Sequence, residues 1–476
     1  MSKPHVVILG AGPAGLGAAY QLARRKTFQV TLLEQNNWVG GNAGSFELSG
    51  VRVDYGSHRL HPSCDHEILQ DIRSLLGEDL LDRPRHGRIR LRDRWIHFPL
   101  KPLNLVTRLP VGFSLGVASD MVRKMARTSN NPHDNQSFAA VMEHGLGRTI
   151  SRDFYFPYAR KMWGLEPDEL SAVQAQRRVR NNSLVKMARK VLTALPGLKS
   201  TGSGHFFYPR HGFGQITEAY CSAAQTAGAQ IHLNAKVEAV EINPVGQPHR
   251  IIFDKESIQQ IIEADHIWST IPITTLARIV QPAPPQALLQ AAAQIDYRSM
   301  ILVYLVLGES KFSEYDAHYF PELSVRITRL SEPKNYSNQS DPADKTVLCA
   351  ELPCSPEDPE WRMSDQELSH LLCESLESAG LPVNAPILQI FVRRLRYAYP
   401  IYRMGYEAHF NHLDDWINQV DGLLTFGRQG LFAHDNTHHA LYMAYSAVKC
   451  LDDEGMFNRQ RWESFRSIFE THVVED

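Results

Sequence analysis

Residues 5–25 carry the stretch HVVILGAGPAGLGAAYQLARR, which decides the fold of the first part of the chain. Residues 5–9 are mostly β-branched and aliphatic, as a strand buried inside a parallel sheet requires. Three glycines follow in the pattern G-x-G-x-x-G, and residues 14–25 then repeat their apolar positions with helical spacing. A second strand at 29–33 ends at Glu34. The stretch therefore predicts a Rossmann-type β-α-β unit.

Each part of this unit has a physical task in binding a dinucleotide. Gly10 permits a tight turn, Gly12 lets the backbone approach a pyrophosphate, and Gly15 lets the helix pack closely on the strand. The helix N-terminus offers N–H groups and the positive end of a dipole to the phosphates. Glu34, about 20 residues beyond the glycines, would accept hydrogen bonds from a ribose diol and repel a 2′-phosphate, which disfavours NADP. A glycine-rich turn without a ligand is the alternative.

A second pair of glycines, in Gly40-Gly41-Asn42-Ala43, follows Glu34 by six residues. It resembles the second glycine motif of flavoproteins of the glutathione-reductase-type-two group, which includes amine oxidases, protoporphyrinogen oxidases and UDP-galactopyranose mutases. The resemblance implies that the cofactor is FAD and that Gly40, Gly41 and Asn42 help to bind it. Most amine oxidases carry Arg where this chain has Asn42, so the motif is more similar to the mutase branch.

Two histidines come next, in the segment DYGSHRLH at residues 54–61. This segment is similar to a mutase segment in which a glycine and two histidines lie against the flavin ring. The resemblance implies that His58 and His61 contact the cofactor and that His58 also acts in catalysis. Histidine can donate to a flavin carbonyl or nitrogen and titrates near neutrality. The alternative is that both are packed or exposed loop histidines.

Aromatic and basic residues farther along suggest a substrate site. Tyr158 and Trp163 match a tyrosine and a tryptophan, five residues apart, that contact the uracil end of the substrate in the mutases. Flat rings on a rigid support suit stacking, although two aromatics in a helical core give the same pattern. Arg177 begins an arginine cluster in which at least one side chain could face a phosphate.

The same resemblance assigns roles to three later positions. The backbone at Val237 contacts the adenine, and Arg329 supplies a guanidinium to the substrate and flavin. A guanidinium suits a diphosphate because its fork bonds bidentately, and a surface salt bridge is the alternative for Arg329. Gly427 and Arg428 belong to a segment similar to the flavin-contacting loop of the group, and Arg428 is also a candidate catalytic residue.

The residues after this loop depart from the mutase pattern. His434 stands where the mutases have a tyrosine that touches the substrate diphosphate, and Asn436 replaces an acid. His434 remains a candidate catalytic and substrate-binding residue, because a protonated imidazole can bind phosphate, and Asn436 remains a candidate cofactor ligand. UDP-galactopyranose therefore does not follow as the substrate.

The overall composition excludes several classes of protein. The 476 residues carry a formal net charge of −2, so there is no general basic field for a nucleic acid. No apolar run approaches the roughly 20 residues that span a bilayer. The six cysteines are scattered without zinc-ligand spacing. We therefore expect a cytoplasmic protein with a small-molecule substrate, no metal and no nucleic-acid partner.

The predicted fold class is α/β, with two domains built from interleaved segments. The FAD-binding domain is discontinuous and takes residues 1–100, 205–285 and 415–476. The substrate domain combines a helical part, 101–204, with a part at 286–414 that contains an antiparallel sheet. The cofactor would lie between the two domains.

Two enzymatic hypotheses follow. The leading one is a mutase-like flavoenzyme that acts on a nucleotide-linked sugar through flavin N5 with no net redox change. The alternative is an FAD-dependent oxidoreductase, similar to protoporphyrinogen oxidase or amine oxidase, that dehydrogenates an amine or a C–H bond. A non-catalytic FAD-binding protein is a third reading. The sequence leaves the substrate, the electron partner and the oligomeric state open.

Overall fold

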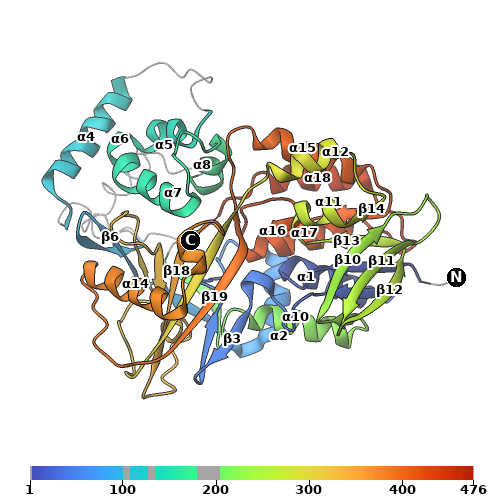
Figure 1. The fold of residues 1–476 in the computed structure, drawn as a ribbon, viewed down its shortest axis with the longest axis horizontal. Helices are drawn as coiled ribbons and strands as arrows, with labels where there is room; N and C mark the ends of the chain where they lie inside the picture. The colour runs from blue at the N-terminus through green and yellow to red at the C-terminus, as the bar shows by residue number, and fades with distance from the viewer. Residues whose placement is uncertain (1–2, 100–107, 127–135, 180–203, 475–476) are drawn as a thin grey trace.

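The computed structural model describes residues 3–99, 108–126, 136–179 and 204–474. Two halves lie side by side (Figure 1). One contains the predicted β-α-β unit, and the other contains a large sheet with helices on both faces. Residues 186–198, whose basic amphipathic pattern predicts a helix packed on the protein, lie outside the described residues.

The first half is organised around a five-stranded parallel sheet. Its strands, in order, are β20 (Leu423–Thr425), β13 (His266–Ser269), β1 (His5–Leu9), β2 (Gln29–Leu33) and β9 (Gln230–His232). The predicted strand–helix–strand unit is confirmed, with α1 (Pro13–Arg25) between β1 and β2.

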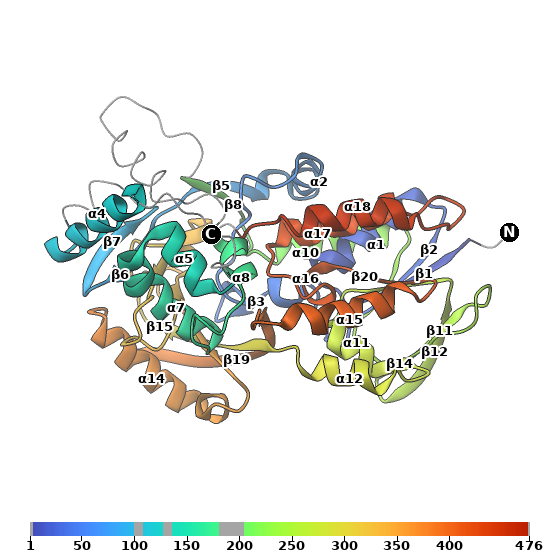
Figure 2. The ribbon, with the colours of Figure 1, turned by 90° about the horizontal axis from the view of Figure 1, so that it is seen from above.

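Strand β1 is apolar throughout because both faces of this sheet are covered. Val6 and Ile8 face a core shared with helices, whereas Val7 and Leu9 face a core shared with a second sheet. The helices on the first side are α1, α10 (Gln215–Thr226), α17 (Thr437–Lys449) and α18 (Arg459–Phe469), with α2 (His66–Leu76) beyond them (Figure 2).

The second sheet has the strand order β12 (Ile258–Ala264), β11 (His249–Lys255), β10 (Ala235–Glu241) and β14 (Val280–Gln281). Three helices lie on the same side of the parallel sheet: α11 (Ile273–Ile279), α12 (Gln286–Ala293) and α15 (Tyr406–Asn418) (Figure 2). In the second sheet β12, β11 and β10 pair antiparallel, and β14 pairs parallel with β10. This half therefore has three layers: helices, the parallel sheet, and the second sheet with its helices.

The other half contains a seven-stranded sheet in the order β19, β15, β18, β17, β16, β6, β7. Every neighbouring pair is antiparallel except β16 with β6. The strands are β19 (Ile387–Pro400), β15 (Tyr297–Leu307), β18 (Thr346–Cys354), β17 (Arg329–Ser331), β16 (Ala317–Tyr319), β6 (Gly87–Leu91) and β7 (Arg94–Phe98).

Alternate residues of β15 again face two different cores. Leu302 and Tyr304 face a core shared with helices of the 108–179 region, and Val303 and Leu305 face α14 (Asp365–Ser378). The helices of the first group are α4 (Val111–Ala126), α5 (Phe138–Leu146), α6 (Arg148–Ile150), α7 (Phe156–Trp163) and α8 (Ala172–Val179).

Short elements connect the two halves. They are the hairpin β3 (Ser45–Leu48) and β4 (Val51–Asp54), the antiparallel pair β5 (Leu80–Pro84) and β8 (His205–Pro209), α13 (Pro333–Ser337) and α16 (Gly427–Gly430). Asp54 fastens the hairpin, because its buried carboxyl accepts hydrogen bonds from Ser45, from Tyr208 and from the Phe213 N–H at 2.6, 2.7 and 2.8 Å.

The expected fold class is confirmed, since a five-stranded parallel sheet is joined to a mixed helical and antiparallel part. The expected division at residue 100 assigns β6 and β7 to the first domain, but both strands belong to the seven-stranded sheet because β6 pairs with β16. None of the helices in the described part of the chain has the length and apolar character of a membrane-spanning segment.

Candidate functional site

The glycine-rich turn after β1 is built for close approach. The Gly10 N–H donates to the Leu33 carbonyl at 2.8 Å with φ at +99°, a conformation that favours glycine. A Cβ on Gly15 would lie 1.9 Å from the Gly10 oxygen, so helix and strand touch there. A Cβ on Gly12 would meet no atom within 4 Å. The backbone is therefore open at Gly12, at the N-terminus of α1.

The second glycine pair packs against the first. The Gly40 N–H donates to the Ala11 carbonyl at 2.8 Å, and a Cβ on Gly41 would lie 3.5 Å from the Gly12 Cα. The Asn42 side chain donates to the Tyr397 carbonyl of β19 at 2.9 Å, which ties this loop to the other half.

Gly427 meets the same helix end from the C-terminal part of the chain. Its φ is +81°, and a Cβ there would lie 2.7 Å from the Ala14 Cβ. Residues that are more than four hundred positions apart in sequence thus surround the first turn of α1.

Glu34 is buried at the carboxyl end of β2. One carboxylate oxygen accepts from the Ala11 N–H at 2.8 Å, and the other accepts from the Asn36 backbone and side chain at 2.9 and 2.6 Å. The Glu34 carbonyl accepts from Ala235 at the start of β10. This contact brings Val237, two residues later on β10, to the same end of the sheet.

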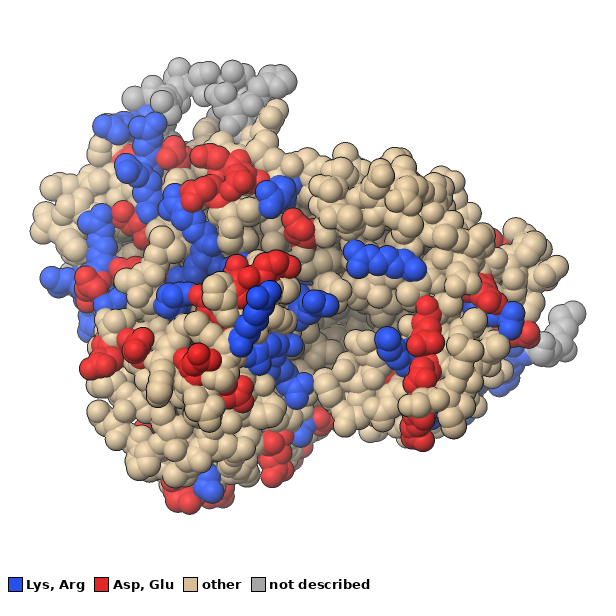
Figure 3. Space-filling model, in the orientation of Figure 1, with Lys and Arg blue, Asp and Glu red and all other residues tan. Residues whose placement is uncertain are grey.

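Five of the predicted site residues line one cavity between the two halves: His58, Arg329, Arg428, His434 and Asn436. Arg59 also lines this cavity. We call the cavity the cationic cavity. On the face drawn in Figure 3, Lys and Arg side chains gather over the half with the seven-stranded sheet and beside a hollow between the halves.

His58 is a neutral imidazole inside this cavity. Burial, together with the nearby Arg329, Arg428 and Arg59, lowers its pKa to about 3. Its Nδ1 is buried and has no hydrogen-bond partner among the described residues, and its ring meets Phe213 edge-on at 5.3 Å. His61 lies elsewhere, in a turn where its Nδ1 contacts the Ser63 hydroxyl at 2.7 Å.

Arg329 is held by a carboxylate that the sequence analysis missed. Its Nε and Nη2 donate to the two oxygens of Glu351 at 3.0 and 2.9 Å, and Glu351 also accepts from the Ser57 N–H at 2.8 Å. The Glu351 side chain is 3% exposed and that of Arg329 is 13% exposed, so the expected alternative of a surface salt bridge does not describe Arg329. The sequence signal that could have revealed Glu351 is its position as the single acid in the mostly apolar strand at 346–354, because a buried acid requires a partner.

Arg428 and His434 both contact the ring of Tyr399. The Arg428 guanidinium lies 4.8 Å from the ring centre of Tyr399 and donates to the Ala398 carbonyl at 2.6 Å. The His434 ring lies 5.1 Å from the same ring, and its Nδ1 contacts the Gln174 amide at 3.2 Å. Asn436 is the N-cap of α17.

The predicted base-binding residues have a different environment. Trp163 is 1% exposed and packs edge-on against Phe138 and Tyr158, within the core beneath the seven-stranded sheet. Neither Tyr158 nor Trp163 lines the cationic cavity. Arg177 does not line the cationic cavity either, but it lies 3.6 Å from Asp435, which does. Its guanidinium donates to the Phe469 carbonyl at 2.8 Å.

Comparison with known proteins places the chain in a family. Residues 13–442 match the sequence pattern of the family of flavin-containing amine oxidoreductases. The chain belongs to that family. It is therefore a flavoenzyme, and its cofactor is FAD. The open backbone at Gly12 and the available Nδ1 of His58 fit a bound dinucleotide that carries a flavin.

Individual proteins of similar sequence match only part of this chain. A probable UDP-galactopyranose mutase of Klebsiella pneumoniae is 25% identical over 174 residues, which are 36% of this chain and 44% of the mutase. A putative flavin-containing monoamine oxidase of Mycobacterium tuberculosis is 28% identical over 253 residues, 51% of this chain and 52% of the oxidase. The matches thus span about half the length of these relatives.

Solved structures of the same fold cover nearly the whole chain. A reduced UDP-galactopyranose mutase superimposes with a TM-score of 0.81 at 20% identity, over 99% of this chain and 100% of that one. A putative protoporphyrinogen oxidase from Exiguobacterium gives 0.72 at 18% identity, over 94% and 98%. At these identities the likeness establishes the fold of this flavoenzyme and not its substrate.

Proposed function

We propose that this flavoenzyme acts on a nucleotide-linked sugar and that the cationic cavity holds the diphosphate of that substrate. The observation that carries the proposal is the meeting of three guanidinium groups, those of Arg59, Arg329 and Arg428, around one cavity. The only carboxylate that lines the cavity with them, among the described residues, is Asp435. Planar guanidinium groups suit a diphosphate because each can donate two parallel hydrogen bonds.

The residues would contribute orientation and charge stabilisation. Arg428 is fixed by the Ala398 carbonyl and the Tyr399 ring, and Arg329 by Glu351, so neither guanidinium has to reorganise when negative charge develops on a departing diphosphate. His58 stays neutral and lines the cavity, and its buried Nδ1 can accept or donate one hydrogen bond. Bound FAD supplies N5 as the reacting atom, with no net redox change over the cycle.

The same side chains favour an anionic diphosphate over a cationic amine. Guanidinium groups have N–H donors and no acceptor, so they can bond phosphate oxygens but cannot accept from an ammonium group.

Dehydrogenation of a neutral amine or of a C–H bond is the second candidate function. It is favoured by the match to an amine oxidoreductase family and by His434, which stands where the mutase pattern has tyrosine. In this case His58, whose pKa is lowered to about 3 by burial and the nearby arginines, would stay neutral and could hydrogen-bond the substrate, but it would be a weak proton acceptor.

Anaerobic incubation of photoreduced protein with a panel of nucleotide sugars tests the proposal. Flavin absorbance and product identity are followed together. An isomerised sugar with the flavin still reduced supports redox-neutral chemistry on a nucleotide sugar. No product and no perturbation of the flavin spectrum would reject it, and rapid oxidation by oxygen or quinones would favour the dehydrogenase.

Arg428→Lys is the matched variant for this experiment. Lysine keeps the positive charge but loses the planar fork. We expect a fall of at least tenfold in kcat/KM with unchanged FAD content, whereas an unchanged kcat/KM would show that Arg428 does not contact the diphosphate.

A further inference from the structure

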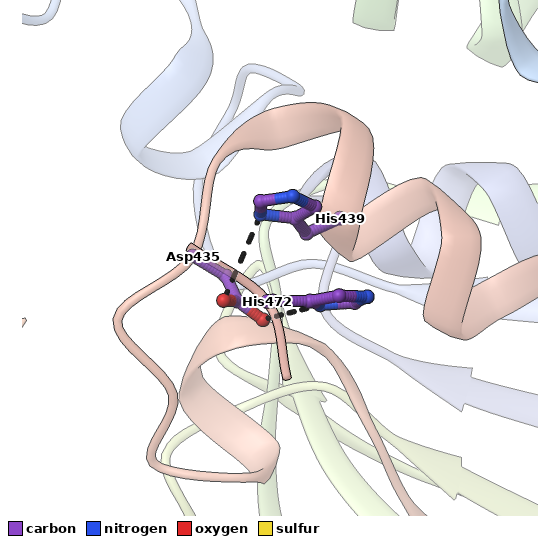
Figure 4. A group of neighbouring side chains, drawn as sticks. All are labelled: Asp435, His439 and His472. Atoms are coloured by element: carbon purple, nitrogen blue, oxygen red, sulfur yellow. Dashed lines mark hydrogen bonds and ion pairs between the residues drawn. The ribbon is translucent and has the colours of Figure 1, made fainter. Parts of the chain in front are cut away.

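A buried carboxylate next to the cationic cavity gathers three basic side chains. The Asp435 side chain is fully buried, and its Oδ1 lies 3.6 Å from the Arg177 guanidinium and 3.7 Å from His439 Nδ1. Its Oδ2 lies 3.3 Å from His472 Nδ1 (Figure 4). Burial alone would raise the pKa of Asp435, but the His472 hydrogen bond and the charges of His439, His472 and Arg177 lower it. Asp435 is therefore an anion.

The ligand atoms of Asp435, His439 and His472 lie within 4.8 Å of one another, a spacing that a metal ion could bridge. The ring orientation argues against a metal. The two imidazoles are stacked, 4.2 Å apart and only 15° from parallel. Because the lone pair of each Nδ1 lies in its ring plane, stacked rings cannot aim both at one ion about 2.1 Å away. Arg177 also places a cation at the carboxylate.

The cluster instead fastens the chain segment that follows α18, residues 470–474, which we call the tail segment. His472 joins it to Asp435, and the Val474 N–H donates to the Arg177 carbonyl at 2.8 Å. The Arg177 guanidinium donates to the Phe469 carbonyl at the end of α18. Asp435 thus holds α8, through Arg177, and the tail segment, through His472.

This fastening brings Val474 to the wall of the cationic cavity, beside Asn436 and Thr437 at the start of α17. An aliphatic side chain therefore borders a cavity whose other walls are mainly polar or charged. The end of the described chain lies at the junction of the two halves, far from the N-terminus (Figures 1 and 2).

We propose that the tail segment is a wall of the substrate site, that Asp435 is the residue that positions it, and that Val474 determines which ligands fit beside Arg428 and His434. The identity of the ligand rests on the proposed function. The docking of the tail segment and its effect on anion access do not.

Hydrogen–deuterium exchange tests the docking in the FAD-loaded protein. His472→Ala removes the bond to Asp435, so we expect the peptide that contains Val474 to exchange at least tenfold faster. His472→Asn keeps an amide N–H near the Nδ1 position and should restore most of the protection. His66→Ala, on the exposed surface of α2, is the matched control and should exchange as the wild type does. Equal exchange in His472→Ala and wild type would overturn the proposal.

Sulfite tests access to the flavin, because it is a small anion that reacts with oxidised flavin and needs no nucleotide. Val474→Trp puts a large ring at the cavity wall, and Val473→Trp is the matched neighbour, which does not line the cavity. We expect Val474→Trp to slow the sulfite reaction at least fivefold and Val473→Trp to change it less than twofold, both with wild-type FAD content. Equal rates in the two variants would overturn the role of Val474.

UDP titration of the same proteins separates the two proposals. If UDP binds the wild type, Val474→Trp should weaken its affinity at least tenfold relative to Val473→Trp, and equal affinities would overturn the assignment of Val474. If neither UDP nor any other nucleoside diphosphate of the sugar panel perturbs the wild-type flavin, the proposed function fails, while the exchange and sulfite results still decide the tail segment.

Discussion

The buried Glu351 on β18 and the largely buried Arg329 on β17, which lines the cationic cavity, form a bidentate ion pair with both nitrogen–oxygen distances near 3 Å. The same carboxylate accepts from the Ser57 N–H, one residue before His58. One acid therefore fixes both the guanidinium and the turn that presents the histidine.

Removing the charge of Glu351 should destabilise the protein strongly. Glu351→Gln leaves the Arg329 guanidinium buried without its counter-charge, and breaking a buried pair typically costs about 3–5 kcal/mol. We expect the free energy of unfolding from urea denaturation to fall by that order. Glu357→Gln, an exposed acid a few residues later, is the control and should change it by less than about 0.5 kcal/mol. Similar losses in the two variants would contradict the buried pair.

The glycines of the first turn should separate cofactor binding from folding. Gly12→Ala introduces a Cβ that meets no protein atom, so the apoprotein should keep its Tm but lose FAD, measured as the ratio of flavin to protein absorbance. Gly15→Ala collides with the Gly10 carbonyl and should lower the Tm of the apoprotein itself. Gly112→Ala, with open space in α4, is the control. Full FAD occupancy in Gly12→Ala would rule out a pyrophosphate at this position.

The β-α-β unit was predictable because its determinants are local. Strand, glycines, helix and the acid at the strand end all lie within residues 5–34, and the structure reproduces each in order. The cavity residues His58, Arg329, Arg428, His434 and Asn436 could be proposed from separate motifs, and the fold brings them together.

The partners of those residues were not predictable from the sequence. Glu351 is paired with Arg329, and Asp316 with Arg59 at 3.1 Å across 257 positions, and such pairings depend on the order of strands in the large sheet. The stacking role of Trp163 shows the same limit. A helical segment specifies the spacing of its aromatics but not which face becomes core, and Trp163 is in the core.

Asp54 should make the protein less stable as pH rises through the acidic range. Burial raises its pKa to about 6, despite hydrogen bonds from Ser45 and Tyr208, whereas in the unfolded chain it is about 3.9. Between these values the folded state binds more protons, so stability falls as pH increases, by roughly 2–3 kcal/mol in total.

Asp54→Asn isolates this effect. Urea denaturation of wild type and variant between pH 4 and 6 should give a difference in unfolding free energy that shifts in favour of the variant as pH rises. Carboxyl groups elsewhere contribute to both proteins and cancel. A difference that stays constant across this range would show that Asp54 titrates normally.

His58 should have the opposite dependence. Burial and three nearby arginines lower its pKa to about 3, so the folded protein keeps it neutral while the unfolded chain takes up a proton near pH 6.5. Stability from this group is therefore complete above pH 6.5 and is lost as pH falls toward 3, by roughly 3–5 kcal/mol. His58→Gln, which cannot titrate, should lose less stability than wild type between pH 6.5 and 4.

Histidine NMR provides a direct measurement of the same group. In protein labelled on histidine, the His58 signals, assigned by their absence in His58→Gln, should show neutral-imidazole shifts and no titration between pH 5 and 8. A His58 midpoint above pH 6 would mean that the imidazole carries a charge near neutrality. A further positive charge would then stand beside Arg329 and Arg428, and His58 would not be the neutral hydrogen-bonding group that the proposed site contains.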